Sequence, residues 1–268
     1  MAADAGKVAL EAHGVRKAYR KDGRALEILD IERFSVREGE FVTLIGPSGC
    51  GKSTFLHIVG GFVNADSGSI LVNGRAVNGP GPDRGMVFQE FALFPWKTVA
   101  GNIAWGLEAQ GVPREKIMTT VWTYLQITGL AEFSNHYPAE LSGGMKQRVA
   151  LARVLAFDPE VLLMDEPFGA LDAQTREAMQ EELTRLWGQS GKTIVFVTHD
   201  IEEAVYLGDR VVVLSARPGR IKQEVKIDLP RPRALDVKKS VRCLEYRNTI
   251  WDLIRAEAAS SGPPSSPR

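Results

Sequence analysis

A glycine-rich segment that ends in lysine and serine carries the strongest chemical signal in the sequence. It reads Gly46-Pro47-Ser48-Gly49-Cys50-Gly51-Lys52-Ser53 and matches the pattern G-x-x-x-x-G-K-[ST]. Glycines let the backbone curl so that successive N–H groups point at phosphate oxygens. Lys52 would reach the β- and γ-phosphates, and the Ser53 hydroxyl suits Mg²⁺. The segment, with Thr54 after it, therefore predicts a site for a nucleoside triphosphate.

Two carboxylates, Asp165 and Glu166, follow the apolar run 161–164. Ligands in a doubly wound sheet bind at the carboxyl ends of the strands, so this pair would face the phosphates. Mg²⁺ keeps several waters, and Asp165 is expected to reach it through one of them. Glu166 would polarise or orient the water that attacks the γ-phosphate. Such a pair elsewhere would more often cap the following segment; beside a phosphate loop it predicts catalysis.

A second anion site is predicted where Ser142, Gly143 and Gly144 open a helix. This serine lies 23 residues before Asp165 (165 − 142). That spacing makes it hard for both anion sites of one chain to hold the same phosphate, so a second chain is expected to supply one. The alternative is a plain serine N-cap followed by flexible glycines.

The elements that must position these residues alternate between strands and helices, which favours an α/β core with a parallel sheet. Apolar and β-branched runs predict strands at 8–19, 25–36, 41–45, 69–72, 86–89, 161–164, 193–198 and 210–214. Helical spacing predicts helices at 52–59, 98–129 (split at 111–113), 142–157, 173–187, 201–207 and about 241–254.

The chain is predicted to divide into three parts. An ATPase-type domain covers 8–228 and contains a helical insertion at about 97–157, a helical extension covers 229–255, and a disordered tail covers 256–268. The basic run from Arg231 to Lys239 favours a solvated surface, with contact to lipid headgroups as the alternative.

Composition excludes several classes of protein. The 268 residues hold 33 Lys plus Arg and 33 Asp plus Glu, and this zero net charge does not favour a nucleic-acid partner. Two distant cysteines, Cys50 and Cys243, do not form a disulfide framework and fit a reducing compartment. No secretory signal is expected at Met1–Gly6, and no apolar run is long enough to cross a bilayer.

Taken together, these motifs resemble the ATP-binding subunits of ABC transporters from about Leu10 to Ile227. In that resemblance, 46–53 is the Walker A, 162–166 the Walker B with its catalytic glutamate, and 141–145 the signature. Gln89 stands for the Q-loop glutamine, Asp172 for the D-loop aspartate, His199 for the switch histidine, and Tyr19 for the aromatic that stacks on adenine. Two residues depart from the usual pattern: Met145 replaces a signature glutamine, and Gly169 replaces a D-loop serine.

The resemblance implies a P-loop NTPase core with a mixed, mostly parallel sheet, an N-terminal antiparallel β subdomain and a helical signature subdomain. It implies ATP and Mg²⁺ as cofactors, with Ser53, Gln89 and Asp165 near the metal. The catalytic residues are expected to be Glu166, His199, Gln89 and Lys52. Two subunits would pair head to tail, so that Ser142, Gly143, Gly144 and Asp172 of one chain face the nucleotide of the other.

A finer resemblance points to the nitrate, sulfonate and taurine importer branch. It rests on the stretches 89–96, 102–103, 166–172 and 215–219. It implies a peripheral subunit on the cytoplasmic face of the inner membrane, held by separate permease subunits and served by a periplasmic solute-binding protein. The alternatives are the ATPase of an exporter or of a lipid-handling system, or an ABC ATPase without transport. The last is expected to carry a long coiled-coil insertion or two nucleotide domains, which the sequence lacks.

Overall fold

The structure is a computed structural model that describes residues 6–21 and 23–260. The first five residues, which bear on the expected absence of a secretory signal, lie outside the described part. So does 261–268, most of the predicted tail. The division of the chain at 228 and 229 stays a prediction.

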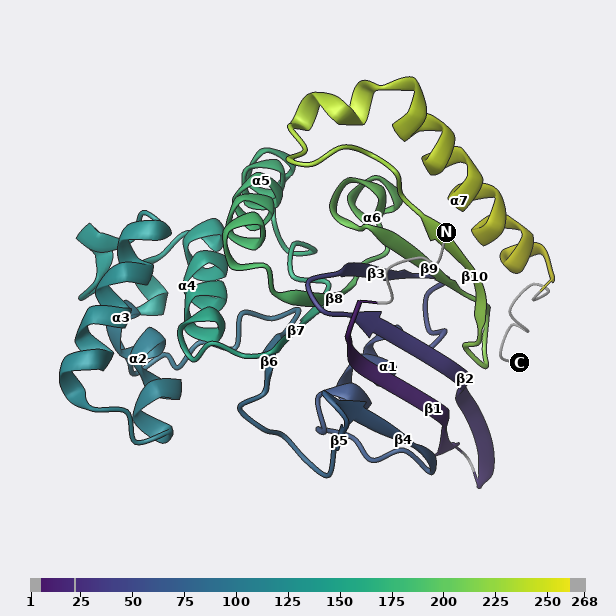
Figure 1. The fold of residues 1–268 in the computed structure, drawn as a ribbon, viewed down its shortest axis with the longest axis horizontal. Helices are drawn as coiled ribbons and strands as arrows, with labels where there is room; N and C mark the ends of the chain where they lie inside the picture. The colour runs from purple at the N-terminus through teal and green to yellow at the C-terminus, as the bar shows by residue number, and fades with distance from the viewer. Residues whose placement is uncertain (1–5, 22, 261–268) are drawn as a thin grey trace.

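A six-stranded sheet forms the centre of the molecule (Figure 1), in the order β10-β9-β3-β8-β7-β6. Five strands run parallel, and β10 pairs antiparallel with β9 at one edge. All residues of β3, β7 and β8 are buried, as expected for strands covered on both faces. The strands are β3 Phe41–Ile45, β6 Arg84–Val87, β7 Val161–Asp165, β8 Thr193–Val197, β9 Arg210–Leu214 and β10 Ile221–Lys226.

An antiparallel sheet in the order β2-β1-β4-β5 forms the predicted N-terminal β subdomain. Its strands are β1 Val8–Lys21, β2 Arg24–Arg37, β4 Ser67–Val72 and β5 Arg75–Ala76. Helix α1 (Lys52–Val59) packs between the two sheets, and the Phe55 ring meets Phe34 of β2 edge-on with 5.3 Å between the ring centroids. One apolar core therefore joins both sheets under the phosphate loop.

A helical lobe extends to one side of the core (Figure 1). Its helices share a core of their own around Val99, Ile103, Leu125 and Val149. The lobe contains α2 Val99–Ala109, α3 Arg114–Ile127, the 3-10 turns η1 Ala131–Phe133 and η2 Pro138–Glu140, and α4 Gly143–Ala156. Helices α5 (Ala173–Ser190) and α6 (Ile201–Leu207) pack on the central sheet.

Strand β10 is not predicted by the apolar pattern of the sequence. Its residues Ile-Lys-Gln-Glu-Val-Lys are partly or fully exposed, because an edge strand is covered on few sides. A polar sequence of this kind gives no apolar run, so only the pairing with β9 reveals the strand.

The C-terminal extension contains the 3-10 turn η3 (Leu235–Lys239) and α7 (Val241–Ser260). Residues 256–260 are helical, so the prediction of a disordered tail from 256 is wrong for these five residues. Glu257 explains the difference: its carboxylate accepts from Lys222 Nζ of β10 at 2.6 Å and from the Ala216 N–H at 3.0 Å. This anchor ties the end of α7 to the hairpin between β9 and β10.

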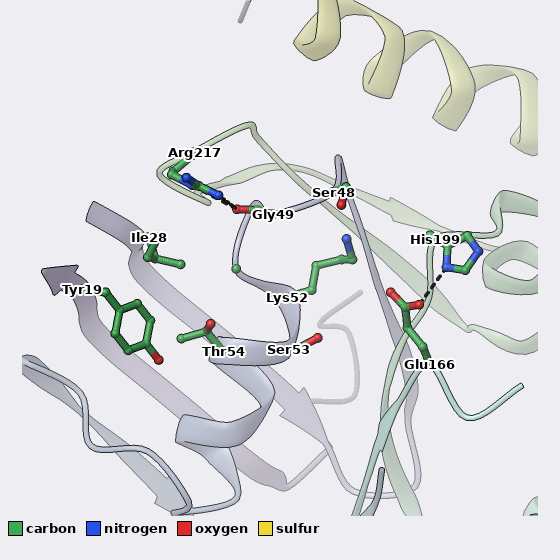
Figure 2. A pocket seen from close by; sticks show the side chains of 11 residues that line it. Tyr19, Ile28, Ser48, Gly49, Lys52, Ser53, Thr54, Glu166, His199 and Arg217 are labelled. Atoms are coloured by element: carbon green, nitrogen blue, oxygen red, sulfur yellow. Dashed lines mark hydrogen bonds and ion pairs between the residues drawn. The ribbon is translucent and has the colours of Figure 1, made fainter. Parts of the chain in front are cut away.

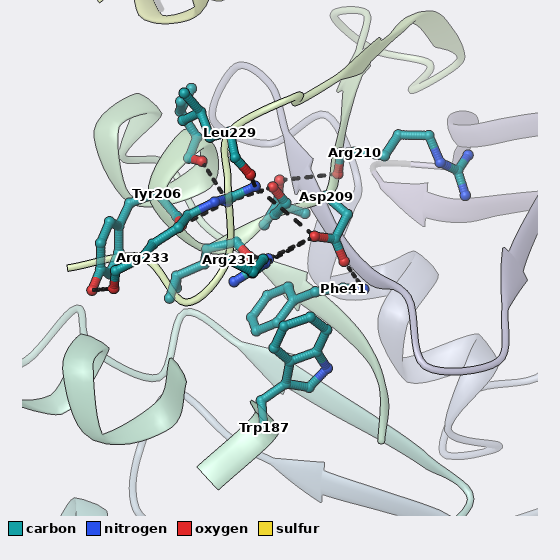
Figure 3. Close-up of polar contacts among 12 residues, drawn as sticks. Phe41, Trp187, Tyr206, Asp209, Arg210, Leu229, Arg231 and Arg233 are labelled. Atoms are coloured by element: carbon teal, nitrogen blue, oxygen red, sulfur yellow. Dashed lines mark hydrogen bonds and ion pairs between the residues drawn. The ribbon is translucent and has the colours of Figure 1, made fainter. Parts of the chain in front are cut away.

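Two arginines ahead of η3 fasten the extension to the core (Figure 3). Arg233 is 4% exposed and donates to the carbonyls of Tyr206 and Gly208 at 2.8 Å each. Arg231 donates to Asp209 at 2.8 Å and stacks over the Trp187 ring, 4.2 Å from its centroid. The expected solvated surface is therefore wrong for Arg231 and Arg233.

Candidate nucleotide site

The phosphate loop joins the carboxyl end of β3 to the start of α1, in the predicted strand–loop–helix context. Gly49 and Gly51 have φ values of 74° and 98°, which favour glycine. A Cβ on Gly46 would lie 2.8 Å from the Leu214 carbonyl oxygen. The loop therefore needs glycine for its curvature at two positions and for close packing at a third.

Lys52 and Ser53 hold the loop in a defined arrangement. The Lys52 side chain is buried, and Nζ donates to the carbonyls of Gly46 at 2.9 Å and Pro47 at 3.2 Å. Ser53 Oγ donates to Asp165 Oδ1 at 2.8 Å. Asp165, the first carboxylate of the acidic pair, thus lies beside the Ser53 hydroxyl that is predicted to bind Mg²⁺, although 112 positions separate the two residues in the chain.

Glu166 and His199 form the second polar pair of the site. His199 Nδ1 lies 2.9 Å from Glu166 Oε2 (Figure 2), and Nδ1 donates in the tautomer that carries a proton there. Glu166 has a φ of 43°, a left-handed conformation that is unfavourable outside glycine. Such strain gathers at functional sites, where the surrounding structure holds it in place.

A pocket of about 600 Å³ opens above the loop and collects most of the predicted nucleotide contacts. Figure 2 places Tyr19 and Ile28 on one side, with Lys52, Glu166 and His199 toward the other. An aromatic side chain at one end and charged groups at the other suit a base and its phosphates. The lining residues are Tyr19, Ile28, Ser48, Gly49, Gly51, Lys52, Ser53, Thr54, Glu166, His199 and Arg217.

The remaining loop residues and Gln89 do not line this pocket. Gly46, Pro47 and Cys50 form the loop behind it; Cys50 is buried, and burial raises the pKa of its thiol. Gln89 Nε2 and Glu166 Oε2 lie 4.0 and 3.9 Å from the point that a Cβ on Gly169 would occupy. Gln89 is therefore close to Glu166, next to Gly169.

The residues predicted to form the signature and the D-loop lie outside the pocket. Ser142 Oγ accepts from the Met145 N–H at 3.3 Å, so the N-cap that the sequence allowed is present. A Cβ on Gly144 would lie 2.6 Å from Thr175 Cγ2, because α4 and α5 approach closely here. Asp172 caps α5, and hydrogen bonds from Thr175 lower the pKa of its carboxyl. Ser142, Gly143, Gly144 and Asp172 thus contribute nothing to the pocket of their own chain.

A buried polar chain holds Thr198, the residue before His199, in place. The Glu203 carboxylate of α6 accepts from Thr198 Oγ1 and from Gln180 Nε2, the latter at 3.0 Å. Lys238 Nζ of η3 donates to Gln180 Oε1 at 2.9 Å. Burial raises the pKa of Glu203. These contacts fix Thr198, which precedes His199, and connect Thr198 to the C-terminal extension through Gln180 and Lys238.

Sequence reasoning missed three residues at this site. Arg217 lines the pocket and donates from Nε and Nη2 to the Gly49 carbonyl at 3.2 and 3.1 Å. Ile28 lines it from β2, and His57 Nε2 lies 3.3 Å from Asp165 Oδ2 without hydrogen-bond geometry. In the sequence, the stretch 215–219 indicates only a resemblance to one importer branch, and this resemblance assigns no role to Arg217.

The profile of the ABC transporter family matches residues 29–169, more than half of the chain. The chain therefore belongs to the ABC transporter ATP-binding family, and it is an ATP-binding and ATP-hydrolysing protein with the P-loop cassette fold. Among residues 6–21 and 23–260, no helix has the length and apolar character of a membrane span.

Two curated relatives and one solved structure place the chain within the family. It is 50% identical to a nitrate import ATP-binding protein of Synechocystis sp., over 82% of this chain and 85% of the relative. It is 47% identical to a taurine import ATP-binding protein of Rhizobium johnstonii, over 87% and 91% of the two chains. A dimeric ATP-binding cassette in a post-hydrolysis state, bound to ADP and Pi, superposes with a TM-score of 0.73 at 33% identity. That match covers 82% of this chain and all of the other.

Proposed function

We propose that this chain is the motor subunit of an importer for a small solute such as nitrate, a sulfonate or taurine. The names of relatives at 47–50% identity support this solute class. The observation that carries the motor role is the composition of the pocket: the phosphate loop, Glu166 and His199 are in it, and the signature is not. A site built in two halves couples ATP binding to the closing of two subunits, because ATP favours the closed pair.

Within one chain, each pocket residue has a role that suits its chemistry. Tyr19 would stack on the adenine, and Lys52 would exchange its two loop carbonyls for phosphate oxygens. Glu166 would act as general base or orient the attacking water. His199, held by that carboxylate, would contact the γ-phosphate. Gln89, close to Glu166, would sense both the metal and the water.

The residues present fit a magnesium ion. Ser53 Oγ and Asp165 offer adjacent oxygen atoms beside the phosphate loop, and Mg²⁺ prefers oxygen ligands. Ser53 would bind the ion directly, Asp165 would bind it through a water, and Gln89 would be a further oxygen ligand. The described residues hold no group of three His, Cys, Asp or Glu suited to a metal, so phosphates and water would supply most of its ligands. Bound Mg²⁺ would neutralise charge that develops on the phosphates.

The second half of the site would come from another ATP-binding subunit, most simply a second copy of this chain. Ser142, Gly143 and Gly144 would present the start of α4 to the γ-phosphate, with Asp172 at the same interface. This start is free of acidic residues in its first turn, as an anion site requires.

A cluster of aromatic side chains at 94–105 supports docking on permease subunits. Trp96 is 72% exposed and Trp105 45%, and the Phe94 ring lies 5.7 and 4.9 Å from them. Arg153 of α4 lies over Phe94, 5.6 Å from its centroid, and donates to the loop carbonyls of Phe91 and Ala92. Exposed aromatic groups on a rigid base are typical of interfaces. We place the subunit at the cytoplasmic face of the inner membrane, with a periplasmic solute-binding protein choosing the solute.

The mass in solution of Glu166→Gln, with and without Mg-free ATP, tests this proposal. The variant keeps the phosphate contacts and loses the base, so ATP is expected to shift it from monomer to dimer without turnover. Adding Ser142→Arg should abolish the shift and leave ATP binding intact. A dimer that forms equally well with Ser142→Arg would remove the signature from the mechanism. In a separate assay with Mg²⁺ present, hydrolysis by Glu166→Gln at the unmutated rate would remove Glu166 as the base.

A further inference from the structure

The hairpin between β9 and β10 packs directly on the phosphate loop. A Cβ on Gly219 would lie 2.0 Å from the Cys50 carbonyl oxygen, so only glycine fits there. The backbone of Gly219 also exchanges hydrogen bonds with β2, accepting from the Asp30 N–H at 3.0 Å and donating to Ile28 at 2.8 Å. The hairpin is therefore fixed against both walls of the nucleotide pocket.

Arg217 extends from this hairpin into the pocket. Its guanidinium contacts the Gly49 carbonyl with two of its five N–H donors, as Figure 2 shows. The remaining donors lie on a side chain that lines the same pocket as Lys52. A planar guanidinium suits phosphate oxygens, which it can bind with paired hydrogen bonds.

The end of α7 holds the hairpin from the far side. Glu257 accepts from the Ala216 N–H, the residue before Arg217, and its second oxygen accepts from Lys222 Nζ. Both hydrogen bonds lower the pKa of Glu257, so its carboxylate is charged at neutral pH. Ser215 closes the turn, because its Oγ accepts from the Arg220 N–H at 3.0 Å. One carboxylate of the C-terminal helix thus positions the residue that enters the pocket.

We propose that Arg217 binds the phosphate chain of the nucleotide and that Glu257 of α7 is the positioning residue that holds it there. This inference rests on the proposed nucleotide site. It makes the C-terminal extension part of ATP binding. Because coupling between two sites is reciprocal, bound ATP should also stabilise the docking of α7.

Titration calorimetry with Mg-free ATP, ADP and AMP tests the role of Arg217. Arg217→Gln is expected to weaken ATP binding about ten-fold, the value of a hydrogen bond to a charged group, and AMP binding less. Arg217→Lys should recover part of the loss. Arg220→Gln, on the same hairpin but paired with Asp30, is the matched control and should change affinity less than two-fold. Equal losses for ATP and AMP, or none for ATP, would overturn the assignment to the phosphates.

One further variant, Lys52→Ala, separates the role of Arg217 from the proposed nucleotide site on which it rests. If Lys52→Ala leaves ATP affinity unchanged, the proposed nucleotide site itself is wrong. If Lys52→Ala weakens binding and Arg217→Gln does not, only the role of Arg217 is wrong.

The role of Glu257 is tested by a double-mutant cycle. Glu257→Ala should weaken ATP binding about three-fold, and with Arg217→Gln it should add nothing further, since both act through one contact. Asp252→Asn, an exposed carboxylate on the same helix, should have no effect. Hydrogen exchange should show ATP protecting the α7 amides in the unmutated chain and less so in Glu257→Ala. Additive losses, or protection that is independent of Glu257, would overturn the link to α7.

Discussion

Glu203 shows how a single buried carboxyl can support an active site without touching its ligand. It is 5% exposed, and its two oxygens accept from Thr198 and Gln180. Those two hydrogen bonds favour the charged form, but burial outweighs them and raises the pKa above the ordinary 4.5. The folded protein therefore binds a proton at Glu203 more tightly than the unfolded chain does.

We predict a pH-dependent loss of stability that Glu203→Gln removes. Because the folded state holds this proton more tightly, the contribution of Glu203 to the free energy of unfolding is greatest below pH 4.5. This contribution decreases as the pH rises through the raised pKa that Glu203 has in the folded protein. The free energy of unfolding, measured by urea denaturation across this pH range, should fall less steeply with pH in Glu203→Gln than in the unmutated chain. Glu181→Gln, an exposed carboxylate on α5, is the control. Identical slopes in Glu203→Gln and the unmutated chain would contradict the shift.

At the scale of elements, the C-terminal extension completes α6. The seven-residue helix ends at Leu207 with carbonyls that need partners. Arg233 supplies them with bonds to Val205, Tyr206 and Gly208, and the positive charge also suits this end of the helix dipole. Helix α6 begins next to His199, so the extension contributes to the geometry around His199.

Arg233→Ala should destabilise the protein strongly. It leaves three buried carbonyls without a partner, at a cost of about 2–4 kcal/mol. For a chain of this length, the melting temperature should fall by about 5–10 °C. Arg242→Ala removes contacts that an exposed guanidinium makes with Asp228 and Tyr246, and it should change the melting temperature by about 1 °C or less. Equal melting temperatures for the Arg233 variant and the unmutated chain would contradict the capping role.

At the scale of the whole molecule, the proposed function gives three surfaces separate tasks. The pocket would bind nucleotide, the start of α4 would face a second subunit, and the aromatic cluster on the helical lobe would face the permease. The cluster lies on a lobe with its own apolar core, so it can be altered without disturbing the pocket. This separation makes the docking proposal testable apart from catalysis.

Trp96→Ser should uncouple transport from ATP binding. It removes the most exposed aromatic side chain of the described residues, and with it a large apolar contact. ATP affinity of the isolated chain should stay within two-fold, while copurification with the permease subunits and ATP-driven uptake should be lost. Trp251→Ser, a 57% exposed tryptophan on α7, is the matched control. Full uptake with Trp96→Ser would exclude this cluster as the docking surface.

The sequence by itself determined the phosphate loop, the acidic pair and the buried strands β3, β7 and β8. Each of these is a local pattern: glycines at turns that need them, carboxylates after an apolar run, and strands that are mostly apolar because both faces are covered. The helical lobe was also predictable, since its helices have ordinary amphipathic spacing.

Only the tertiary structure decided which distant residues share the site. Arg217 and Glu257 have no local signature, because their roles depend on a hairpin and a helix that meet the phosphate loop from far along the chain. The sequence does not predict the polar strand β10, and it wrongly predicts a solvated Arg233, for the same reason. Their polar side chains suit solvent locally but find partners in other elements. Sequence patterns record the environment of a residue along its own element, whereas the contacts that close a pocket are made between elements.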